Sequence, residues 1–457
     1  MKRHCWRLLC VLLLVLMMLA VLPVACGGDD ETTTTAGPAT TAGPATTAGP
    51  TTSASPTTQA STETTLGGKD KIVIGAARPI SGVLSVYEES ALGPIYKMWV
   101  EEVNAEGGIQ VAEYGKKLPV EMKVYDDQSD LDTCMTLLEK LMVEDKVDFV
   151  LSPASTAFVF AAANVANDHG YLLIAGEAGA RSIEELLPDF PMFFGLLSYS
   201  DHYDMPALFE IYKEVGVKTV AMIYVEDLHG LEYSEVVRAE AEKAGIELVY
   251  DEQVPMGTAD FAPILRKIQA TNADSLLACC YPDQNFPMVG QMIQLGYSPK
   301  MLVLGPGGTF GVFPAAMGGE GGLEQGHAVV EGVCGYGVWS KNSSPALGEL
   351  HDKLLARVGS EGNMNYYGYA YFVAALDMLK QAIEKAGTLD NAKVAEVLKT
   401  EHFETVLGDT WFDNQLLAKE CYAGQIGQWQ NGVIEVIDVG DKRTADPIYP
   451  KPSWPGQ

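Results

Sequence analysis

Residues 71–82 read KIVIGAARPISG, an apolar run of strand-forming residues that ends in a loop containing proline and glycine. The apolar part, 71–76, predicts a strand buried on both faces, which is typical of parallel sheets. Apolar residues with helical spacing follow at 91–104 and stop at Gly107-Gly108, before a second predicted strand at 120–125. A strand, a helix and a second strand in this order predict a parallel α/β unit.

The same alternation continues along the chain and restarts after a break. Further strands are predicted at 148–151, 171–175, 219–224, 247–250, 275–279 and 301–304, and helices at 131–144, 156–168, 233–244, 261–270 and 286–295. Near the end we expect a long helix at 366–386 and a hairpin at 424–439 that turns at Asn431-Gly432. The folded part, residues 69–457, is longer than a single hydrophobic core usually supports, so we expect two doubly wound α/β lobes.

The N-terminus has the pattern of an export signal with a lipidation site. Lys2, Arg3 and Arg7 precede an apolar run at 8–24, which stops at Ala25-Cys26. This pattern predicts cleavage before Cys26 and transfer of a lipid to its thiol. We therefore expect the mature protein to be anchored to the cell membrane of a bacterial envelope, outside the cytoplasm.

An uncleaved membrane helix is the alternative, because a run of about 17 residues is near the lower limit for spanning a bilayer. Three features argue against it: small Ala25 before the cysteine, Pro23 within the run, and the GGDD stretch at 27–30. Pro23 also stands where the usual lipidation motif has leucine. The Thr-, Ala-, Gly- and Pro-rich segment 31–68 forms no core and predicts a semi-extended linker.

Charge excludes one class of partner. The chain has 31 Lys and Arg residues against 60 Asp and Glu, a net charge of −29. Removal of Lys2, Arg3 and Arg7 with the signal leaves 28 basic residues against 60 acidic ones, a net charge of −32. Such an acidic surface repels phosphate backbones, so we expect no nucleic acid partner.

The cysteines of the folded part show no metal or redox spacing. They are Cys134, Cys279, Cys280, Cys334 and Cys421, and no two of them form Cys-x-x-Cys. Adjacent Cys279 and Cys280 fit small core residues on opposite faces of a strand. A bridge between Cys334 and Cys421 remains open at this point.

Several catalytic and cofactor motifs are missing. A dinucleotide site needs Gly-x-Gly-x-x-Gly directly after the first strand, where this chain has GAARP at 75–79. The glycine-rich stretch 305–311 lacks the Gly-Lys-Ser/Thr end of a phosphate loop, and no Gly-x-Ser-x-Gly elbow is present. The acidic stretch 126–132 lacks the glycine and the closing glutamate of a calcium loop and is better explained as a capped helix start. The aspartates and histidine at 201–204 also lack the spacing of a metal site. We expect no enzyme activity, no cofactor and no metal.

Ligands of open parallel sheets bind where loops leave the carboxyl ends of the strands and helix N-termini present free N–H groups. The loop SPAST at 152–156 directly follows a predicted strand. Ser155 or Thr156 either caps the next helix or directs its hydroxyl at a ligand carboxylate, and the sequence leaves both open.

Five short motifs together carry a family resemblance. In order they are GAARPISG (75–82), NAEGGI (104–109), YDDQS (125–129), SPAST (152–156) and DLHG (227–230). Their order and spacing resemble the type I periplasmic binding proteins of the branched-chain amino-acid (Leu/Ile/Val-binding) family over residues 71–440. The resemblance implies two lobes joined by three crossings, expected near 196–200, 332–339 and 406–411. It places residues 69–197 and 338–407 in lobe 1, and 198–337 and 408–457 in lobe 2.

The resemblance also implies ligand contacts on both lobes. The matching positions are Tyr87, Thr156, Glu177, Ala178, Gly179, His229, Tyr281 and Tyr366, the last more weakly, and they join Ser155 in the candidate ligand site. Each has a plainer interpretation: the tyrosines as interface packing, His229 as a solvated turn residue and Glu177 as a charge at a helix start.

Two departures bear on the solute. Gly179 stands where the family has a threonine, and Gly307 where it has an acid that neutralises an ammonium group. Glu177 could supply that charge; without it, an amide or aromatic acid fits better than leucine, because an unpaired buried cation is costly. The sequence thus predicts the substrate-binding protein of an ABC importer, whose partners are a permease and its ATPase subunits. A surface sensor with the same fold is the alternative.

Overall fold

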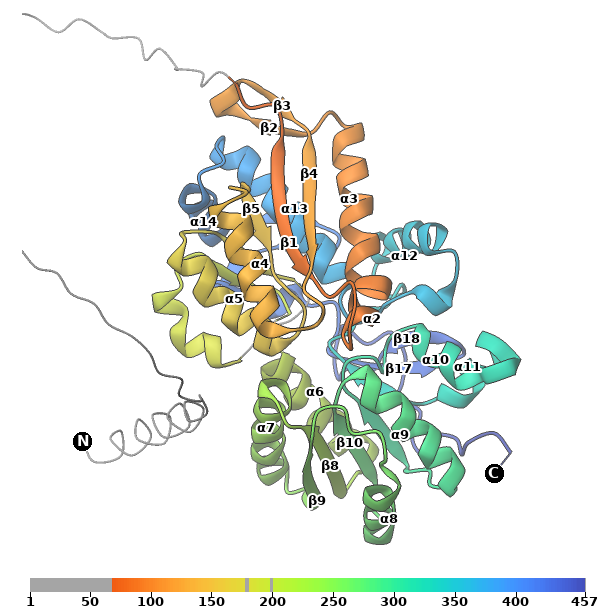
Figure 1. The fold of residues 1–457 in the computed structure, drawn as a ribbon. Helices are drawn as coiled ribbons and strands as arrows, with labels where there is room; N and C mark the ends of the chain where they lie inside the picture. Colours follow the sequence, from red (N-terminus) through yellow and green to blue (C-terminus); the bar gives the residue numbers. More distant parts are fainter. Residues whose placement is uncertain (1–67, 177–180, 198–199, 457) are drawn as a thin grey trace, which may run out of the picture. The chain divides into compact units, whose positions relative to one another are not determined.

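Two seven-stranded sheets organise the part of the chain that the computed structural model describes, residues 68–176, 181–197 and 200–456 (Figure 1). The described residues belong to one structural unit. In spatial order the first sheet contains β4 (Val120–Asp126), β1 (Ile72–Arg78), β5 (Phe149–Leu151), β6 (Leu173–Ala175), β7 (Phe193–Gly195), β16 (Leu416–Leu417) and β15 (Phe412–Asp413). All neighbours are parallel except β15, which is antiparallel to β16.

The second sheet repeats this plan. In spatial order it contains β9 (Glu247–Val254), β8 (Thr219–Val225), β10 (Ser275–Cys279), β11 (Met301–Leu304), β12 (Cys334–Tyr336), β17 (Ile426–Gln430) and β18 (Val433–Val436). The first five are parallel, and β17 and β18 add an antiparallel hairpin. We call each sheet with its helices a lobe, the first lobe and the second lobe.

Strand order places a switch point in each lobe. In both sheets the first strand of the lobe lies between the second and the third, so the chain winds outward in opposite directions from there. Loops that leave the carboxyl ends of strands on either side of such a point diverge and leave room for a ligand. In the first lobe these are the loops after β1 and β5, and in the second lobe those after β8 and β10.

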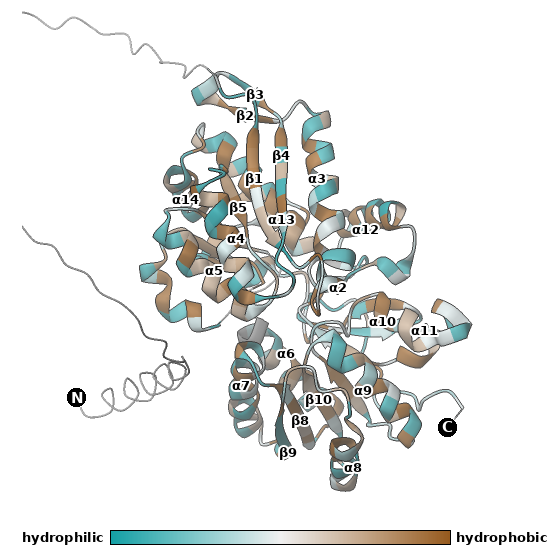
Figure 2. Cartoon of the chain, in the orientation of Figure 1, coloured by the Kyte–Doolittle hydropathy of each residue, from teal (hydrophilic) through white to brown (hydrophobic). Residues whose placement is uncertain are grey.

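The strands form because their residues are apolar and β-branched and have helices on both sides. Ile72, Ile74 and Ala76 of β1 are fully buried, as expected for a central parallel strand. Figure 2 shows the central strand β1 largely in brown, whereas the edge strand β9 and many residues of the helices are teal.

Helices connect the strands in both lobes. Those of the first lobe include α2 (Ser85–Tyr87), α3 (Gly93–Ala105), α4 (Leu131–Val143), α5 (Thr156–Asp168), α12 (Pro345–Val358), α13 (Tyr369–Ala386) and α14 (Asn391–Thr400). Those of the second lobe include α6 (Ser200–Val215), α7 (Leu228–Ala244), α8 (Ala262–Thr271), α9 (Pro282–Leu295), α10 (Val312–Gly318) and α11 (Gly322–Val330). Two small hairpins, β2 (Ile109–Val111) with β3 (Lys116–Leu118) and β13 (Phe403–Thr405) with β14 (Gly408–Thr410), lie outside the large sheets.

The predicted fold class is confirmed, with differences at helix starts. Helix α7 begins five residues before the predicted start at 233, because Asp227 caps it by accepting the Gly230 N–H at 2.9 Å. Helix α9 begins at Pro282, whose fixed φ suits the first helical position. In the acidic stretch 126–132, Asp130 caps α4 by accepting the Thr133 N–H, as predicted.

The third crossing lies later in the chain than expected. Because β15 and β16 belong to the first sheet, the chain returns to the second sheet between Leu417 and Ile426. The predicted crossing at 406–411, and the lobe boundary at 407/408 with it, are therefore corrected. These strands of two residues are too short to produce a recognisable apolar period.

The predicted hairpin is present, and its turn has a local cause. Gln430 pairs with Val433, and the two residues between them, Asn431 and Gly432, have φ of +53° and +78°. Positive φ at both turn positions favours asparagine followed by glycine, because most other side chains are strained in this backbone conformation.

All five cysteines of the folded part are free and buried. The bridge between Cys334 and Cys421 that the sequence left open is therefore not formed. Cys279 and Cys280 are both buried, on opposite sides of their strand, as predicted.

The predicted signal, Cys26 and the linker up to residue 67 lie outside the described residues. Among the helices that are described, none combines the length and the apolar character needed to cross a bilayer.

Candidate functional site

Loops at the two switch points bring three side chains together across the lobes. Tyr281, after β10 of the second lobe, donates a hydrogen bond from its hydroxyl group to Asp227 Oδ2 at 2.7 Å. Its hydroxyl oxygen lies 3.3 Å from the Oγ atom of Ser155, which follows β5 of the first lobe. Because the Tyr281 proton is used for Asp227, Ser155 is the donor in the contact between the lobes.

The backbone of Ser155 is strained. Its φ of +79° and ψ of 142° lie in a region that only glycine normally occupies. The side chain does not cap α5, although Ser155 is the residue before the first helical one. The cap interpretation is therefore wrong for Ser155, whose hydroxyl contacts Tyr281 of the other lobe, and a contact with a ligand carboxylate stays a prediction. Strain of this kind is often retained at functional sites.

Ser155→Gly is expected to have a free energy of unfolding about 1 kcal/mol higher than that of Ser155→Ala, because both variants lose the hydroxyl that contacts Tyr281 and only glycine relieves the backbone strain. Relief of the strain contributes about 1–3 kcal/mol, and the more flexible unfolded chain offsets about 1 kcal/mol of that gain. The control is Ala239→Gly on the exposed face of α7, where glycine is expected to cost about 0.5–1 kcal/mol relative to alanine. Denaturant titration measures all three variants, and a Ser155→Gly protein that is no more stable than Ser155→Ala would contradict the assignment of strain.

His229 lies in an aromatic cluster rather than in solvent. It is 3% exposed, and its ring packs against Tyr233 and Tyr281 with centroids 4.6 and 5.2 Å apart. Its Nε2 atom lies 3.2 Å from the hydroxyl of Tyr336. Burial lowers the pKa of His229 to about 4, so the ring is neutral at pH 7. The alternative of a solvated turn residue is thereby excluded.

Tyr87 faces the second lobe from the first. Its ring meets that of Phe310 edge-on, with centroids 5.5 Å apart, and only 5% of the residue is exposed. Burial raises the pKa of the Tyr87 hydroxyl, and the nearby Tyr367, Asp283 and Asp227 raise it further. The Phe310 ring and the carboxyl groups of Asp227 and Asp283, all from the second lobe, therefore lie near Tyr87 of the first lobe.

Of the other predicted site residues, one lies beside Ser155, one lies apart from it, and three fall outside the described residues. Thr156 is the first residue of α5 and is buried beside Ser155. Tyr366 lies apart from this group, because its hydroxyl donates to Glu361 at 2.7 Å and its ring packs against Trp339 and Trp429. Three predicted positions, Glu177, Ala178 and Gly179, lie outside the described residues.

The backbone at Gly307 explains the missing acidic residue. Its φ is +99°, and a β-carbon there would lie 2.7 Å from Cγ of Pro282. A side chain would therefore be strained by the backbone and crowded by the start of α9.

Two carboxyl groups were missed by sequence reasoning. Asp227 belongs to the DLHG motif but was not assigned to the site, although its Oδ2 atom accepts the hydrogen bond from the Tyr281 hydroxyl. Asp283 lies in the first turn of α9, where burial of its carboxyl raises the pKa. Their position after strands β8 and β10 was the signal that could have identified them.

A buried ion pair supports the first-lobe side of the site. Arg78, at the end of β1, lies with its Nε 3.4 Å from Glu88 Oε2 and donates from Nη1 to the Ser152 carbonyl at 2.6 Å. Tyr96 donates its hydroxyl to the same Glu88 carboxylate at 2.7 Å. The guanidinium thus connects helix 88–92 to the loop that carries Ser155.

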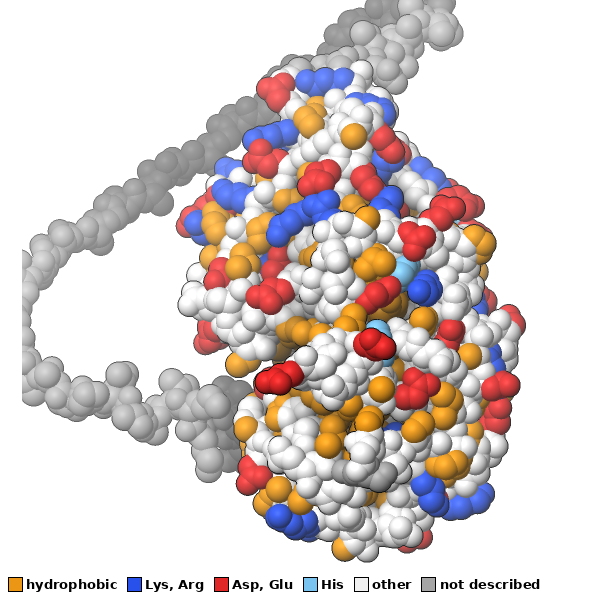
Figure 3. Space-filling model, turned by 90° about the vertical axis from the view of Figure 1, so that its right-hand side faces the viewer, with side chains coloured by type: hydrophobic (Ala, Val, Ile, Leu, Met, Phe, Trp, Pro, Cys, Tyr) orange, Lys and Arg blue, Asp and Glu red, His pale blue; other side chains and the backbone are white. Residues whose placement is uncertain are grey.

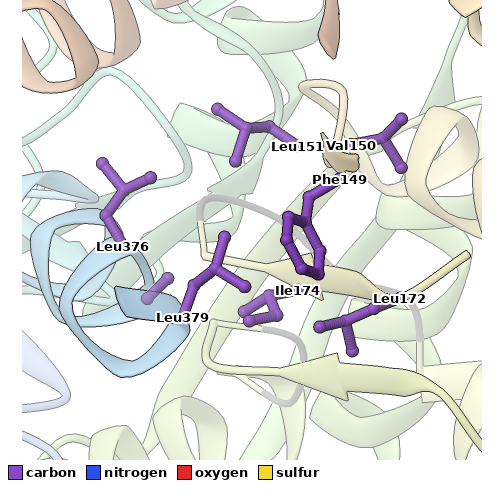
Figure 4. A pocket seen from close by; sticks show the side chains of 8 residues that line it. Phe149, Val150, Leu151, Leu172, Ile174, Leu376 and Leu379 are labelled. Atoms are coloured by element: carbon purple, nitrogen blue, oxygen red, sulfur yellow. The ribbon is translucent and has the colours of Figure 1, made fainter. Parts of the chain in front are cut away.

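The small void in the first lobe is not a ligand site. It measures about 10 Å³ and is enclosed by aliphatic and aromatic side chains of β5, β6 and α13 (Figure 4). A space of this size holds at most about one water molecule, and its walls offer no polar partner. It is a packing defect between the sheet and α13.

The surface agrees with the acidic composition. On the face drawn in Figure 3, carboxylates and basic side chains are interspersed over both lobes, and no large basic patch is visible there. This face offers no footprint for a nucleic acid backbone.

Residues 71–432 match the family model described as "Periplasmic binding protein". A relative from Pseudomonas aeruginosa, the "Leucine-, isoleucine-, valine-, threonine-, and alanine-binding protein", is 26% identical over 354 residues, which cover 76% of this chain and 87% of the relative. The folds of two solved structures are also similar. The branched-chain amino acid transporter substrate-binding protein LivJ from Streptococcus pneumoniae, in complex with isoleucine, has a TM-score of 0.65 at 21% identity over 80% of this chain and 98% of its own.

The second structure is a solute-binding protein of an ABC transporter from R. palustris in complex with 4-hydroxybenzoate. It has a TM-score of 0.65 at 18% identity and covers 84% of this chain and 99% of its own. The family consists of proteins that bind solutes and catalyse no reaction. The chain therefore belongs to the type I periplasmic binding proteins of the branched-chain amino-acid family.

Proposed function

We propose that this protein is the extracytoplasmic substrate-binding protein of an ABC importer and captures a small organic solute between its lobes. The observation that carries the proposal is the contact of Ser155 with Tyr281, which joins the switch points of the two lobes. A solute held there contacts both lobes only when they meet, so its binding energy favours the closed arrangement.

The solute class follows from the side chains around this contact. Tyr87, Phe310 and Tyr281 offer aromatic surface, while Asp227 and Ser155 offer an acceptor and a hydroxyl. The first N–H groups of α5 add donors suited to a carboxylate. We infer an amino acid, an amide or an aromatic acid, which is consistent with the amino-acid and hydroxybenzoate ligands named for the relatives.

We also propose that a lipid on Cys26 tethers the protein to the membrane, near a permease and its ATPase subunits. The basic tip, the apolar run and the small residue before Cys26 support this. The Pro- and Thr-rich linker at 31–68 supplies the reach that a tethered binding protein needs.

A thermal-shift screen of amino acids, amides, ureas and aromatic acids tests the proposal. A solute at one hundred times its dissociation constant is expected to add about 2.7 kcal/mol of stability. In the variant Tyr281→Phe, loss of the hydroxyl is expected to lower the affinity for the best solute about tenfold, since a buried hydrogen bond contributes about 1–1.5 kcal/mol.

Tyr171→Phe is the matched control for this variant. Tyr171 also uses its hydroxyl, donating to the Val147 carbonyl at 2.9 Å, but it lies inside the first lobe away from Tyr281. We expect the control to keep the affinity of the unmodified protein. No stabilising compound in any class, or equal affinities in both variants, would contradict the proposal.

A further inference from the structure

A second set of contacts between the lobes lies on α7, apart from the Ser155 and Tyr281 contact. Glu232 of α7 accepts the backbone N–H of Arg181 at its Oε2 atom, at 2.7 Å, and that of Ser182 at its Oε1 atom, at 2.8 Å. One turn further along, Glu235 Oε2 accepts from the Arg181 guanidinium at 2.6 Å. Arg181 and Ser182 lie between β6 and β7 of the first lobe, whereas both glutamates belong to the second.

The Glu232 contacts have the geometry of a helix cap supplied by the other lobe. Arg181 and Ser182 are the first residues of the 3₁₀ helix η3 (Arg181–Asp189). The first N–H groups of a helix have no acceptor within it and usually bond to a side chain just before them. Here one carboxylate from α7 satisfies two of these groups, and its negative charge is favourable at a helix N-terminus.

These hydrogen bonds form only when the lobes meet, and in that arrangement the Glu232 carboxyl group is buried. Glu232 is 7% exposed, and burial raises the pKa of its carboxyl while the N–H groups of Ser182 and Arg181 lower it in part. Helices α5 and α7, one from each lobe, also contact each other. When the lobes separate, Glu232 loses both donors at once, because both lie in the first lobe.

We propose that Glu232 and Glu235, with Arg181 and Ser182, form a latch that favours the closed arrangement of the lobes and so sets how firmly a solute is held. Glu232 is a positioning residue: it acts through the lobe arrangement and touches no solute-binding side chain identified above. The inference rests on the proposed solute capture, but it concerns an equilibrium that exists without solute.

The test measures the distance between the lobes in the full chain with no solute present. Nitroxide labels are attached to cysteines introduced at Asp168 in α5 and Glu242 in α7, which are both exposed; Cys5, Cys10 and Cys26 are replaced by serine, and the native cysteines of the folded part are buried. Pulsed electron resonance then gives the ratio of closed to open molecules. Glu232→Ala is expected to lower this ratio at least tenfold, which corresponds to about 1.4 kcal/mol.

Graded variants distinguish the latch from a general loss of stability. Glu232→Gln keeps an uncharged acceptor and is expected to give an intermediate ratio. Arg181→Ala removes the Glu235 pair but keeps the backbone N–H that Glu232 accepts, and it is expected to lower the ratio two- to threefold. It tests the latch from the other lobe, even if Glu232→Ala does not fold. The control is Glu240→Gln, because Glu240 pairs with Lys243 inside α7 and does not reach the first lobe.

An unchanged ratio in the Glu232 variants, or a fall of equal size in Glu240→Gln, would overturn the latch. An unmodified protein that shows only the open distance would overturn it as well. The solute screen is a separate measurement, so a latch without any stabilising solute would refute only the proposed function.

Discussion

Replacing Arg78 by alanine is expected to lower the free energy of unfolding by about 3–5 kcal/mol. Arg78 is fully buried and Glu88 is 7% exposed, so removal of the guanidinium leaves a buried carboxylate without its counter-charge. It also leaves the Ser152 carbonyl without the donor at 2.6 Å. Denaturant titration of the alanine variant measures the loss.

Two further variants identify the cause of this loss. Lys71→Ala removes an exposed ion pair with Glu121 and is expected to cost less than about 1 kcal/mol. The double variant Arg78→Met with Glu88→Leu removes both buried charges and is expected to recover much of the stability. If the double variant is as unstable as Arg78→Ala, the unpaired carboxylate is not the cause.

Acidification is expected to destabilise the protein through His229 by about 3 kcal/mol between pH 6.5 and pH 4. Burial lowers the pKa of His229 in the folded protein to about 4, from 6.5 in the unfolded chain. The unfolded chain therefore binds a proton in this window while the folded protein does not. Stability is lost as the pH falls through the window and changes no further, through this group, below pH 4.

The measured quantity is the difference between the unmodified protein and His229→Phe across this pH range. Burial raises the pKa of both Asp377 and Asp438 to about 6, so these groups favour the folded state as the pH falls and oppose the effect of His229. Both carboxyl groups remain in the variant, and their contribution cancels in the difference. A difference that does not change between pH 6.5 and pH 4 would show that His229 takes up its proton normally in the folded protein.

The fold was predictable because its signals are local. Residues 71–76, 120–125 and 219–224 were each recognised as strands from short apolar runs, and the structure places β1, β4 and β8 there with ends that differ by at most two residues. The errors arose where a local signal was ambiguous. Helices were predicted to start at 233 and 286, but Gly230 and Pro282 already lie in their first turns, and the pairing of β15 and β16 with the first sheet depends on strands distant in the chain.

The candidate site was only partly predictable. Ser155 was named from its loop at a strand end, and His229 and Tyr281 from the family resemblance; the structure brings Ser155 to Tyr281 and packs His229 against the Tyr281 ring. Asp227 was overlooked because an aspartate before a helix is explained equally well as a cap, and in the structure it caps α7 and accepts from Tyr281 at once. Tyr366 was assigned near the site, but its hydroxyl is bound to Glu361 instead.

Apolar periodicity, charge and motif order were sufficient to predict two wound α/β lobes, their family and an acidic surface, since each can be read from the linear sequence without knowing which distant residues meet. Contacts between the lobes needed the folded structure. Ser155 and Tyr281 are 126 positions apart, and Arg181 and Glu232 are 51 positions apart. Such pairs meet only because two separately folded sheets present their strand ends and helices to each other, and no local pattern encodes that approach.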